Sequence, residues 1–415
     1  MSWFNCTKAS AKRMLIVGLL SNSVTPLATA AVQEITAVFR PDSSNPQKNI
    51  FENTTPQSGI CPGHIPQRCE ALNIFSIRTL DITFESNRSI PAGHESEREG
   101  AMFKVPSAWR DLTVVHSETG AVETVQMRIA GIGGRWDTSR PPGVTAFGPQ
   151  AANWGGAPAP CVPSGYIAAA TSYLLWFWIV PEGAGACSRT AQLDIPWLKY
   201  TTFEYAYELK TPNPLGMSTG QYTGSIVFGI GPGEDFDFGD TMIPNDNNLI
   251  FNFTLDVQHT LKVEIPPGGN RVELVPQGGW QAWLTQGRKP TRLFSDQTFN
   301  VSSSTRFKMN LDCQYSTDGN RCSVRDSVFG HVVPLDVSVT LPNGLVDASA
   351  QPVTRRPLRR DGIGTELFLP SFYVDRKPGT LHFEIAQDEV GEMLKPGIGR
   401  SYSGSVTVIW DSEAG

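Results

Sequence analysis

One short motif in this chain has the spacing of a catalytic serine site. Residues 216–220 (GMSTG) match G-x-S-x-G, a pattern in which a strand leads into the serine and a helix follows it. Here Pro212 and Pro214 precede the motif and a strand pattern follows it. We therefore expect no nucleophile elbow, and we predict that the protein is not an enzyme and has no catalytic residues.

A glycine-rich stretch carries a cluster of acidic residues, namely Glu234, Asp235, Asp237 and Asp240. A Ca²⁺ site uses carboxylates at such spacing. No EF-hand pattern is complete, however, so solvated turns are the favoured interpretation and a metal site is the alternative. The six histidines lie apart and form no H-E-x-x-H motif. We expect no metal and no cofactor.

Four residues of a Gly/Pro-rich stretch could bind a receptor, and they are Arg135, Trp136, Arg140 and Trp154. Long loops on a rigid β-scaffold often carry binding residues. Indole faces stack on sugar rings, and a guanidinium binds a carboxylate through two hydrogen bonds. These four are the candidate receptor contacts; the alternative is that both tryptophans belong to the core.

The cysteines point to an oxidising compartment. Residues 1–30 have a basic start, an apolar stretch at 14–20 and an A-x-A site at 28–30, which is typical of a secretory signal peptide. Six of the seven cysteines come after this segment. Among the possible pairings we prefer sequence neighbours, because each loop is then short and contains Gly, Pro or Ser. These pairs are Cys61–Cys69, Cys161–Cys187 and Cys313–Cys322.

Composition favours an all-β protein. The 415 residues include 39 glycines and 31 prolines, and only 18% are charged, which disfavours a coiled coil. The net charge of −6 argues against a nucleic-acid binder. At about 150 residues per domain, the length suggests two or three domains.

Strand patterns separated by turns supply the elements of this fold. The predicted strands are Leu80–Phe84, Val122–Ile129, Ile250–Leu255, Leu261–Ile265, Val332–Val339 and Leu381–Ile385. Short helices are expected at Asp388–Leu394 and near Ala168. The uncharged stretch Tyr166–Val180 is shorter than the ~20 residues of a membrane span, so it predicts a buried strand or short helix.

A strand pattern occurs twice. Residues 222–228 (YTGSIVF) and 402–408 (YSGSVTV) both read Y-[T/S]-G-S-apolar-x-apolar, 180 residues apart. The tyrosine hydroxyl can anchor a tight corner, the glycine permits close backbone approach, and the alternation places one face in a core. The repeat predicts two related immunoglobulin-like β-sandwiches.

The two copies differ in the length of chain beyond them. Residues 229–240 leave room for a closing strand after the first copy, whereas only residues 409–415 remain after the second. Seven residues are too few for a turn and a return strand of about five residues. We therefore expect the second sandwich to lack its last strand, with Val406, Val408 and Trp410 facing an open groove. The predicted domains are 31–243 and 244–415, after a signal peptide at 1–30.

Together these features resemble the tip subunits of alternate chaperone–usher fimbriae, the cable-pilus (CblD-like) and colonisation-factor (CfaE-like) initiators. The shared features are a secreted chain of similar size, two halves and a final Y-x-G-S-apolar strand. Other segments with this likeness are Thr260–Trp283, Pro290–Phe294, Arg306–Met309 and the cysteine-flanked Cys161–Arg189. The likeness covers most of the chain after residue 30 and is stronger in the second half.

The resemblance implies an N-terminal adhesin domain and a C-terminal pilin domain with an open donor-strand groove. A periplasmic fimbrial chaperone would fill the groove temporarily, and a major pilin would fill it permanently with its N-terminal strand. The resemblance further implies an outer-membrane usher, a host glycan or protein receptor, and a place at the fimbrium tip on the bacterial cell surface, reached through the periplasm.

One departure concerns the receptor. Enterotoxigenic relatives are credited with binding through arginines, and the matching stretch here, Gly229–Asp240, is acidic, so those residues are not transferred. The alternative function is a stand-alone secreted carbohydrate-binding β-sandwich protein or glycan-active enzyme. Such a protein needs a complete last strand, and an enzyme needs two carboxylates in one cleft. The short ending after Val408 favours the tip subunit.

Overall fold

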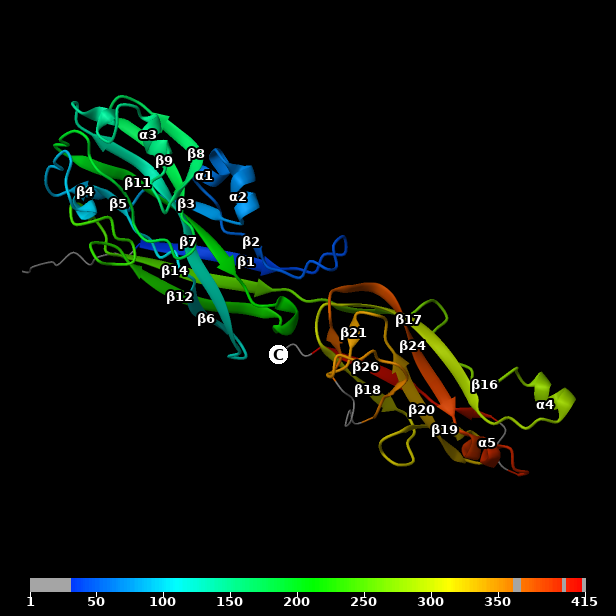
Figure 1. The fold of residues 1–415 in the computed structure, drawn as a ribbon. Helices are drawn as coiled ribbons and strands as arrows, with labels where there is room; N and C mark the ends of the chain where they lie inside the picture. The colour runs from blue at the N-terminus through cyan, green and yellow to red at the C-terminus, as the bar shows by residue number, and fades with distance from the viewer. Residues whose placement is uncertain (1–30, 361–366, 398–400, 413–415) are drawn as a thin grey trace, which may run out of the picture.

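The computed structural model describes residues 31–360, 367–397 and 401–412, and the signal peptide predicted at residues 1–30 lies outside them. Strands are the main regular structure of the described residues, which form two bodies that lie end to end (Figure 1). No helix among them is long and apolar enough to cross a membrane. The expectation of an all-β, two-domain chain is confirmed.

The first body, residues 31–257, contains a large curled sheet in the order β13-β4-β11-β7-β6-β12-β14-β1-β2. Its strands are β1 (Ala31–Phe39), β2 (Glu52–Asn53), β3 (Phe75–Thr79), β4 (Phe84–Ser86), β5 (Ala101–Phe103), β6 (Arg110–His116), β7 (Val122–Thr138), β8 (Val162–Ala169), β9 (Tyr173–Ile179), β10 (Cys187–Arg189), β11 (Leu198–Lys210), β12 (Gly220–Gly229), β13 (Met242–Pro244) and β14 (Asn248–Val257). Its short helices are α1 (Ile60–Gly63), α2 (Pro66–Leu72) and α3 (Ala152–Gly155).

The second body, residues 261–412, has a sheet in the order β15-β17-β24-β20-β19-β25 and a separate pair, β18–β26. Its strands are β15 (Leu261–Glu264), β16 (Val275–Pro276), β17 (Leu293–Ser303), β18 (Phe307–Cys313), β19 (Cys322–Asp326), β20 (Val332–Thr340), β21 (Leu345–Val346), β22 (Arg356–Pro357), β23 (Leu369–Pro370), β24 (Val374–Ile385), β25 (Tyr402–Ser403) and β26 (Val406–Ser412). Its helices are α4 (Gln281–Gln286) and α5 (Gln387–Met393).

The local predictions of helix and strand hold at some places and fail at others. The helix at Asp388–Leu394 is α5. The apolar stretch Tyr166–Val180 lies in the β8–β9 hairpin, so a strand is confirmed; its buried part is β9, because residues 166–169 of β8 are half-buried or exposed. The helix near Ala168 is wrong, because that residue lies in β8. The strand at Leu80–Phe84 is also wrong, since β3 ends at Thr79 and β4 begins at Phe84.

The predicted domain boundary at residues 243 and 244 differs from the structure. Strand β14 comes after that boundary, yet it pairs with β12 and β1 of the first body along its length. Its inward side chains are buried in the first core, and they are Leu249, Phe251, Phe253, Leu255 and Val257. The first body therefore continues to Val257, because the apolar side chains of β14 are buried in its core.

All three preferred disulfides are present. They join Cys61 to Cys69, Cys161 to Cys187, and Cys313 to Cys322. The second of these closes the segment that holds the β8–β9 hairpin, and the third joins the end of β18 to the start of β19.

Candidate functional site: an unpaired strand edge in the second body

The two copies of the repeated pattern begin in equivalent positions. Tyr222, at the start of β12, pairs with His116 of β6 in an antiparallel ladder. Tyr402, in β25, pairs in the same sense with Asp326 of β19. In each body the paired strand then forms a hairpin with the next, β6 with β7 and β19 with β20. The sequence repeat is thus also a repeat of strand topology.

The glycine of each copy lies close to a neighbouring backbone. A Cβ added to Gly224 would lie 2.2 Å from the carbonyl oxygen of Thr113 in β6. A Cβ added to Gly404 would lie 3.1 Å from the carbonyl oxygen of Ser323 in β19. Close backbone approach, expected at both glycines, is confirmed and is tighter in the first body.

The tyrosine hydroxyls of the two copies have different partners. The N–H of Ser218 donates to the Tyr222 hydroxyl at 2.9 Å, which fixes the corner before β12 as expected. The Tyr402 hydroxyl instead lies 2.7 Å from Nδ1 of His331, a side chain at the turn between β19 and β20.

The serine of the G-x-S-x-G match belongs to this corner. Ser218 is buried, comes after the 3₁₀ turn Pro214–Gly216, and leads into strand β12. Because the order here is turn, serine, strand, residues 216–220 do not form the strand–serine–helix arrangement of a nucleophile elbow.

The two copies differ most at their edges. Strand β12 pairs with β6 on one edge and with β14 on the other. Strand β26 pairs with β18, from Val406 opposite Cys313 to Ser412 opposite Phe307. Within residues 401–412 and the rest of the described chain, no strand pairs with the second edge of β26. Its N–H and C=O groups on that edge are therefore available to an added strand.

One face of β26 is apolar and turned towards the second core. Val406, Val408 and Trp410 alternate with exposed residues and are half-buried. The Trp410 ring packs against Phe299 and Phe307, with centroid distances of 4.9 and 5.6 Å. The predicted groove residues thus share one face beside an unpaired edge; that a donated strand covers them stays a prediction.

In the first body, a strand pairs with the edge that is unpaired in β26. There β14 runs antiparallel to β12 from Gly220 to Gly229 and parallel to β1, so it lies between the repeated strand and the first strand. Every second side chain of β14 is buried in the core of the first body. By this internal comparison, no strand in the described part of the second body corresponds to β14, and a strand added at that position would run antiparallel to β26.

Two of the predicted receptor contacts are core residues. Trp136 is 0% exposed and Trp154 is 2% exposed. Their rings pack against each other with a centroid distance of 5.5 Å. Phe147 and Trp178 cover them further. The prediction that these indole faces stack on a sugar is wrong for this fold, because other aromatic rings already occupy the faces.

The two arginines of that prediction lie in different surroundings. The Arg135 guanidinium hydrogen-bonds Asp137, which raises the arginine's pKa, and it lies 4.0 Å from the centroid of the Tyr173 ring. Arg140 is exposed on the loop after β7. Neither arginine shares a surface with the two buried tryptophans, so the four residues do not form a joint binding site.

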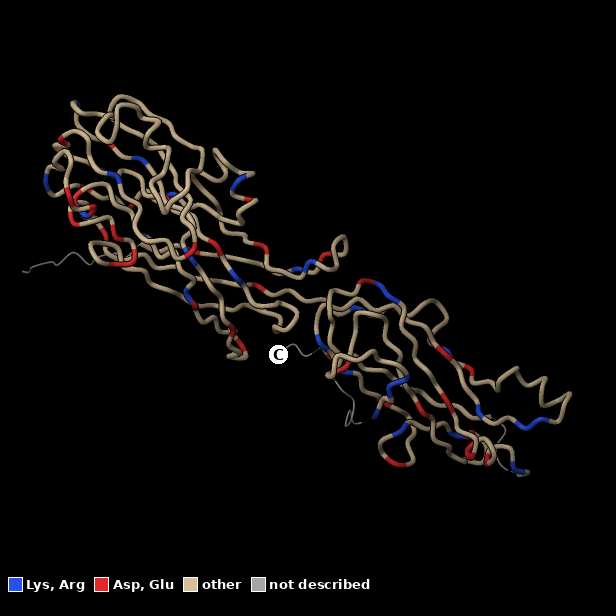
Figure 2. The backbone as a smooth tube through the Cα atoms, viewed as in Figure 1, with Lys and Arg blue, Asp and Glu red and all other residues tan. Residues whose placement is uncertain are grey.

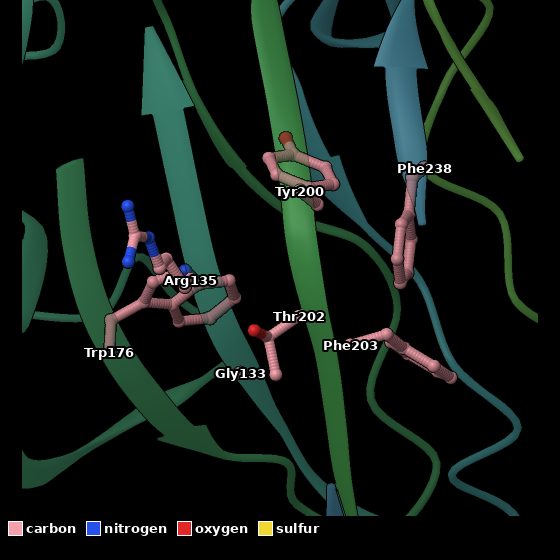
Figure 3. Close-up of a pocket in the computed structure, with 7 residues that line it drawn as sticks. All are labelled: Gly133, Arg135, Trp176, Tyr200, Thr202, Phe203 and Phe238. Carbon is pink, nitrogen blue, oxygen red and sulfur yellow. The ribbon is translucent and has the colours of Figure 1, made fainter. Parts of the chain in front are cut away.

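A small cavity lies beside Arg135. Its volume is about 10 Å³, which is room for one water molecule and not for a sugar. Figure 3 shows Arg135 and Trp176 on one side of it and the aromatic rings of Tyr200, Phe203 and Phe238 on the other.

Three of the four acidic residues, Asp235, Asp237 and Asp240, are paired with arginines. Arg98 contacts Asp237 at 2.8 Å and Asp240 at 2.7 Å, and Arg110 forms an ion pair with Asp235. The hydrogen bond from Arg98 lowers the pKa of the Asp240 carboxyl. Asp237 is buried, so the expectation of solvated turns is wrong for this residue.

Figure 2 shows acidic residues gathered in the loops near β4 and β5. Among the described residues, no three His, Cys, Asp or Glu side chains are grouped to hold a metal ion.

A wider surface cleft lies next to this cluster. It has a volume of about 370 Å³ and is lined by Lys104–Ala108 and Arg110, by Gly183–Ala184 and by Gly233–Asp235. Lys104 and Asp237 form an isolated bridge, and β5 pairs with β10, which brings these loops together. Sequence reasoning missed the cleft because its three segments are far apart in the chain and share no motif.

Comparisons with known proteins give weak likenesses. No protein-family model matches this chain, and no curated protein matches its sequence. Among solved structures, the chain is similar to CfaE, the adhesive subunit of CFA/I fimbria of enterotoxigenic Escherichia coli, with 11% identity, 93% of this chain and 95% of that chain covered, and a TM-score of 0.26. It is also similar to a chain of the CsuC-CsuE chaperone-tip adhesion subunit pre-assembly complex from archaic chaperone-usher Csu pili of Acinetobacter baumannii, with 9% identity, 92% and 99% covered, and a TM-score of 0.21. Likenesses this weak do not establish a function, so the function is inferred from the strand geometry of this chain.

Proposed function

We propose that this chain is the minor tip subunit of a fimbria, which initiates assembly by donor-strand complementation. The observation that carries the proposal is the edge pairing of the repeated strand: β12 has a partner on both edges, whereas β26 has one on a single edge among the described residues. An added strand gains affinity from main-chain hydrogen bonds and selectivity from alternate side chains.

The first body supplies the expected form of the donor. Strand β14 is 10 residues long, runs antiparallel to β12 and buries every second side chain. A donor for β26 should therefore be a similar strand with alternating apolar residues, running antiparallel to β26. A periplasmic fimbrial chaperone would supply such a strand first, an outer-membrane usher would receive the complex, and the N-terminal strand of a major pilin would replace the chaperone's.

The test is to supply the strand within the chain. Because the donor would run antiparallel to β26, a short turn can join residue 415 to the N-terminal extension of the major pilin. The fusion is compared by calorimetry with residues 31–415 alone. The alternate apolar side chains of the extension should stabilise the second body by about 4 kcal/mol when they are buried. For a domain of this size, each kcal/mol raises the melting temperature by about 2–4 °C, so the melting temperature of the second body should rise by roughly 10 °C.

The control fusion carries the same extension with its alternate apolar residues replaced by serine, and it should melt like the unfused chain. If all three proteins melt at the same temperature, the second body needs no added strand. The stand-alone carbohydrate-binding protein or glycan-active enzyme would then be the better explanation.

We further propose that the first body mediates adhesion, and that the 370 Å³ cleft beside Lys104 is its receptor site. The volume lies within the ~300–1,000 Å³ range of small-molecule sites, and the cleft has both cationic and acidic walls. This cleft replaces the buried tryptophans as the surface to test.

The adhesion proposal predicts the effect of filling the cleft. Ala108 is exposed on the cleft wall, so Ala108→Arg should fold normally and weaken binding to a glycan array at least tenfold. Ala71→Arg, on the exposed face of α2, is the matched control and should bind like the unchanged protein. Equal binding by the two variants and the parent would remove the cleft as the receptor site.

A further inference from the structure

The hairpin turn between β6 and β7 in the first body has a defined hydrogen-bond pattern. The His116 N–H donates to the Ala121 carbonyl at 2.8 Å, and the Gly120 N–H donates to the His116 carbonyl at 3.1 Å. The side-chain Nδ1 of His116 accepts the N–H groups of Glu118 and Thr119 at 3.2 and 3.0 Å.

The turn between β19 and β20 in the second body has the same pattern. The Asp326 N–H donates to the His331 carbonyl at 2.8 Å, and the Gly330 N–H donates to the Asp326 carbonyl at 3.1 Å. The carboxylate Oδ2 of Asp326 accepts the N–H groups of Val328 and Phe329 at 3.0 and 2.6 Å. Both turn glycines have φ of +71°, so the two turns are structurally equivalent.

The two turns differ in the side chains that they expose. The first carries Glu118 and Thr119, which are both exposed and polar. The second carries Val328 and Phe329, which are 72% and 61% exposed. The first turn demonstrates that this backbone does not require apolar residues at these positions. Two adjacent exposed apolar side chains on a hydrogen-bonded turn would be buried by a partner that docks there, which gives the turn a reason to carry them.

The position of the first turn indicates what such a surface meets. Nε2 of His116 lies 2.9 Å from the Thr219 carbonyl oxygen. Two residues away, the Met217 carbonyl oxygen lies 3.0 Å from Nε2 of His259, which leads into the second body. The turn thus lies at the end of the first body that faces the second, as Figure 1 also shows. The second body comes directly after β14, the strand that completes β12.

The second body has the corresponding geometry. Val257, the last residue of β14, pairs with Gly220, just before Tyr222. A strand that pairs with β26 in the direction in which β14 pairs with β12 would end near Tyr402. Tyr402 pairs with Asp326, the residue that begins the turn with Val328 and Phe329. The folded body attached to that strand would then lie against the turn.

We propose that Val328 and Phe329 contact the folded body of the subunit whose strand completes β26. This inference rests on the proposed function, and it adds a second contact surface outside the donated strand. The occupant is the body of the next pilin, because at the equivalent end of the first body the next domain comes directly after the completing strand β14.

The test compares two probes. One is the N-terminal extension of the major pilin as a peptide. The other is the intact major pilin, whose own groove is closed by a fused copy of that extension. The variant Val328→Glu/Phe329→Thr copies the first body's own turn. It should bind the peptide within twofold of the unchanged protein, whereas the intact pilin should dissociate about tenfold faster. Surface plasmon resonance measures both.

Leu80→Ser/Val122→Ser is the matched control, since these residues are 73% and 62% exposed on the first body. The control should bind both probes normally. Unchanged dissociation of the intact pilin from the turn variant overturns the inference, and so does an equal loss of peptide and pilin binding. If the unchanged protein does not bind the peptide, the proposed function itself fails.

Discussion

At the scale of single residues, the glycine of the repeated strand is fixed by its neighbours and not by its own torsion angles. Gly224 and Gly404 have no positive φ, but each faces a carbonyl oxygen of the adjacent strand. The side chain that is missing at these positions lets the two backbones approach. The tightness of that approach differs between the bodies, which gives a quantitative prediction.

Gly224→Ala should destabilise the first body by about 2–4 kcal/mol, because its Cβ would lie 2.2 Å from a backbone oxygen that cannot rotate away. Gly404→Ala should destabilise the second body by roughly 1 kcal/mol, since at 3.1 Å a small shift relieves the contact. Calorimetry that resolves the two transitions measures both losses. Equal losses would show that the close approach does not decide the cost.

The tryptophans show what residue type cannot reveal. Trp136 and Trp154 lie in a Gly/Pro-rich segment that looked like a binding loop, yet Trp136 is in the long strand β7 and Trp154 is in α3. Both pack among other rings, so their indole faces stabilise the core. An exposed and a buried tryptophan have the same local sequence signal.

At the scale of elements, β14 is the strand that links the two bodies. It completes the first sheet between β12 and β1, and it also leads into the second body. Its loss would leave one edge of β12 without a partner strand, as the second edge of β26 is among the described residues.

Residues 31–257 expressed alone should therefore fold into a monomer with one cooperative melting transition. Residues 31–243, which end at the boundary predicted from sequence, should be unstable or aggregate, because the five buried apolar side chains of β14 are missing. Circular dichroism and size-exclusion chromatography distinguish the two results. A stable 31–243 fragment would contradict the role given to β14.

At the scale of the whole molecule, the chain displays one step of a head-to-tail arrangement. A strand completes the first body and the next body comes at once after it. A donated strand at β26 would repeat this step between chains. Such a contact joins two different surfaces, so it propagates in one direction and yields a filament instead of a closed dimer.

Sequence alone determined what depends on short stretches of chain. Strand patterns placed five of the six predicted strands correctly, the Y-x-G-S repeat identified two equivalent strands, and loop length identified the three disulfides. These signals are local, because side-chain direction in a strand alternates with every residue. The half-buried face of Val406, Val408 and Trp410 also resulted from this alternation.

The tertiary structure alone decided which strands pair across long separations. It assigned β14 to the first sheet, buried Trp136 and Trp154, and brought three loops together around the cleft beside Lys104. It also made the turns at 117–120 and 327–330 comparable, although their residues differ. Strand pairing and burial depend on contacts between residues far apart in the chain, and no local pattern specifies which distant edge a strand will meet.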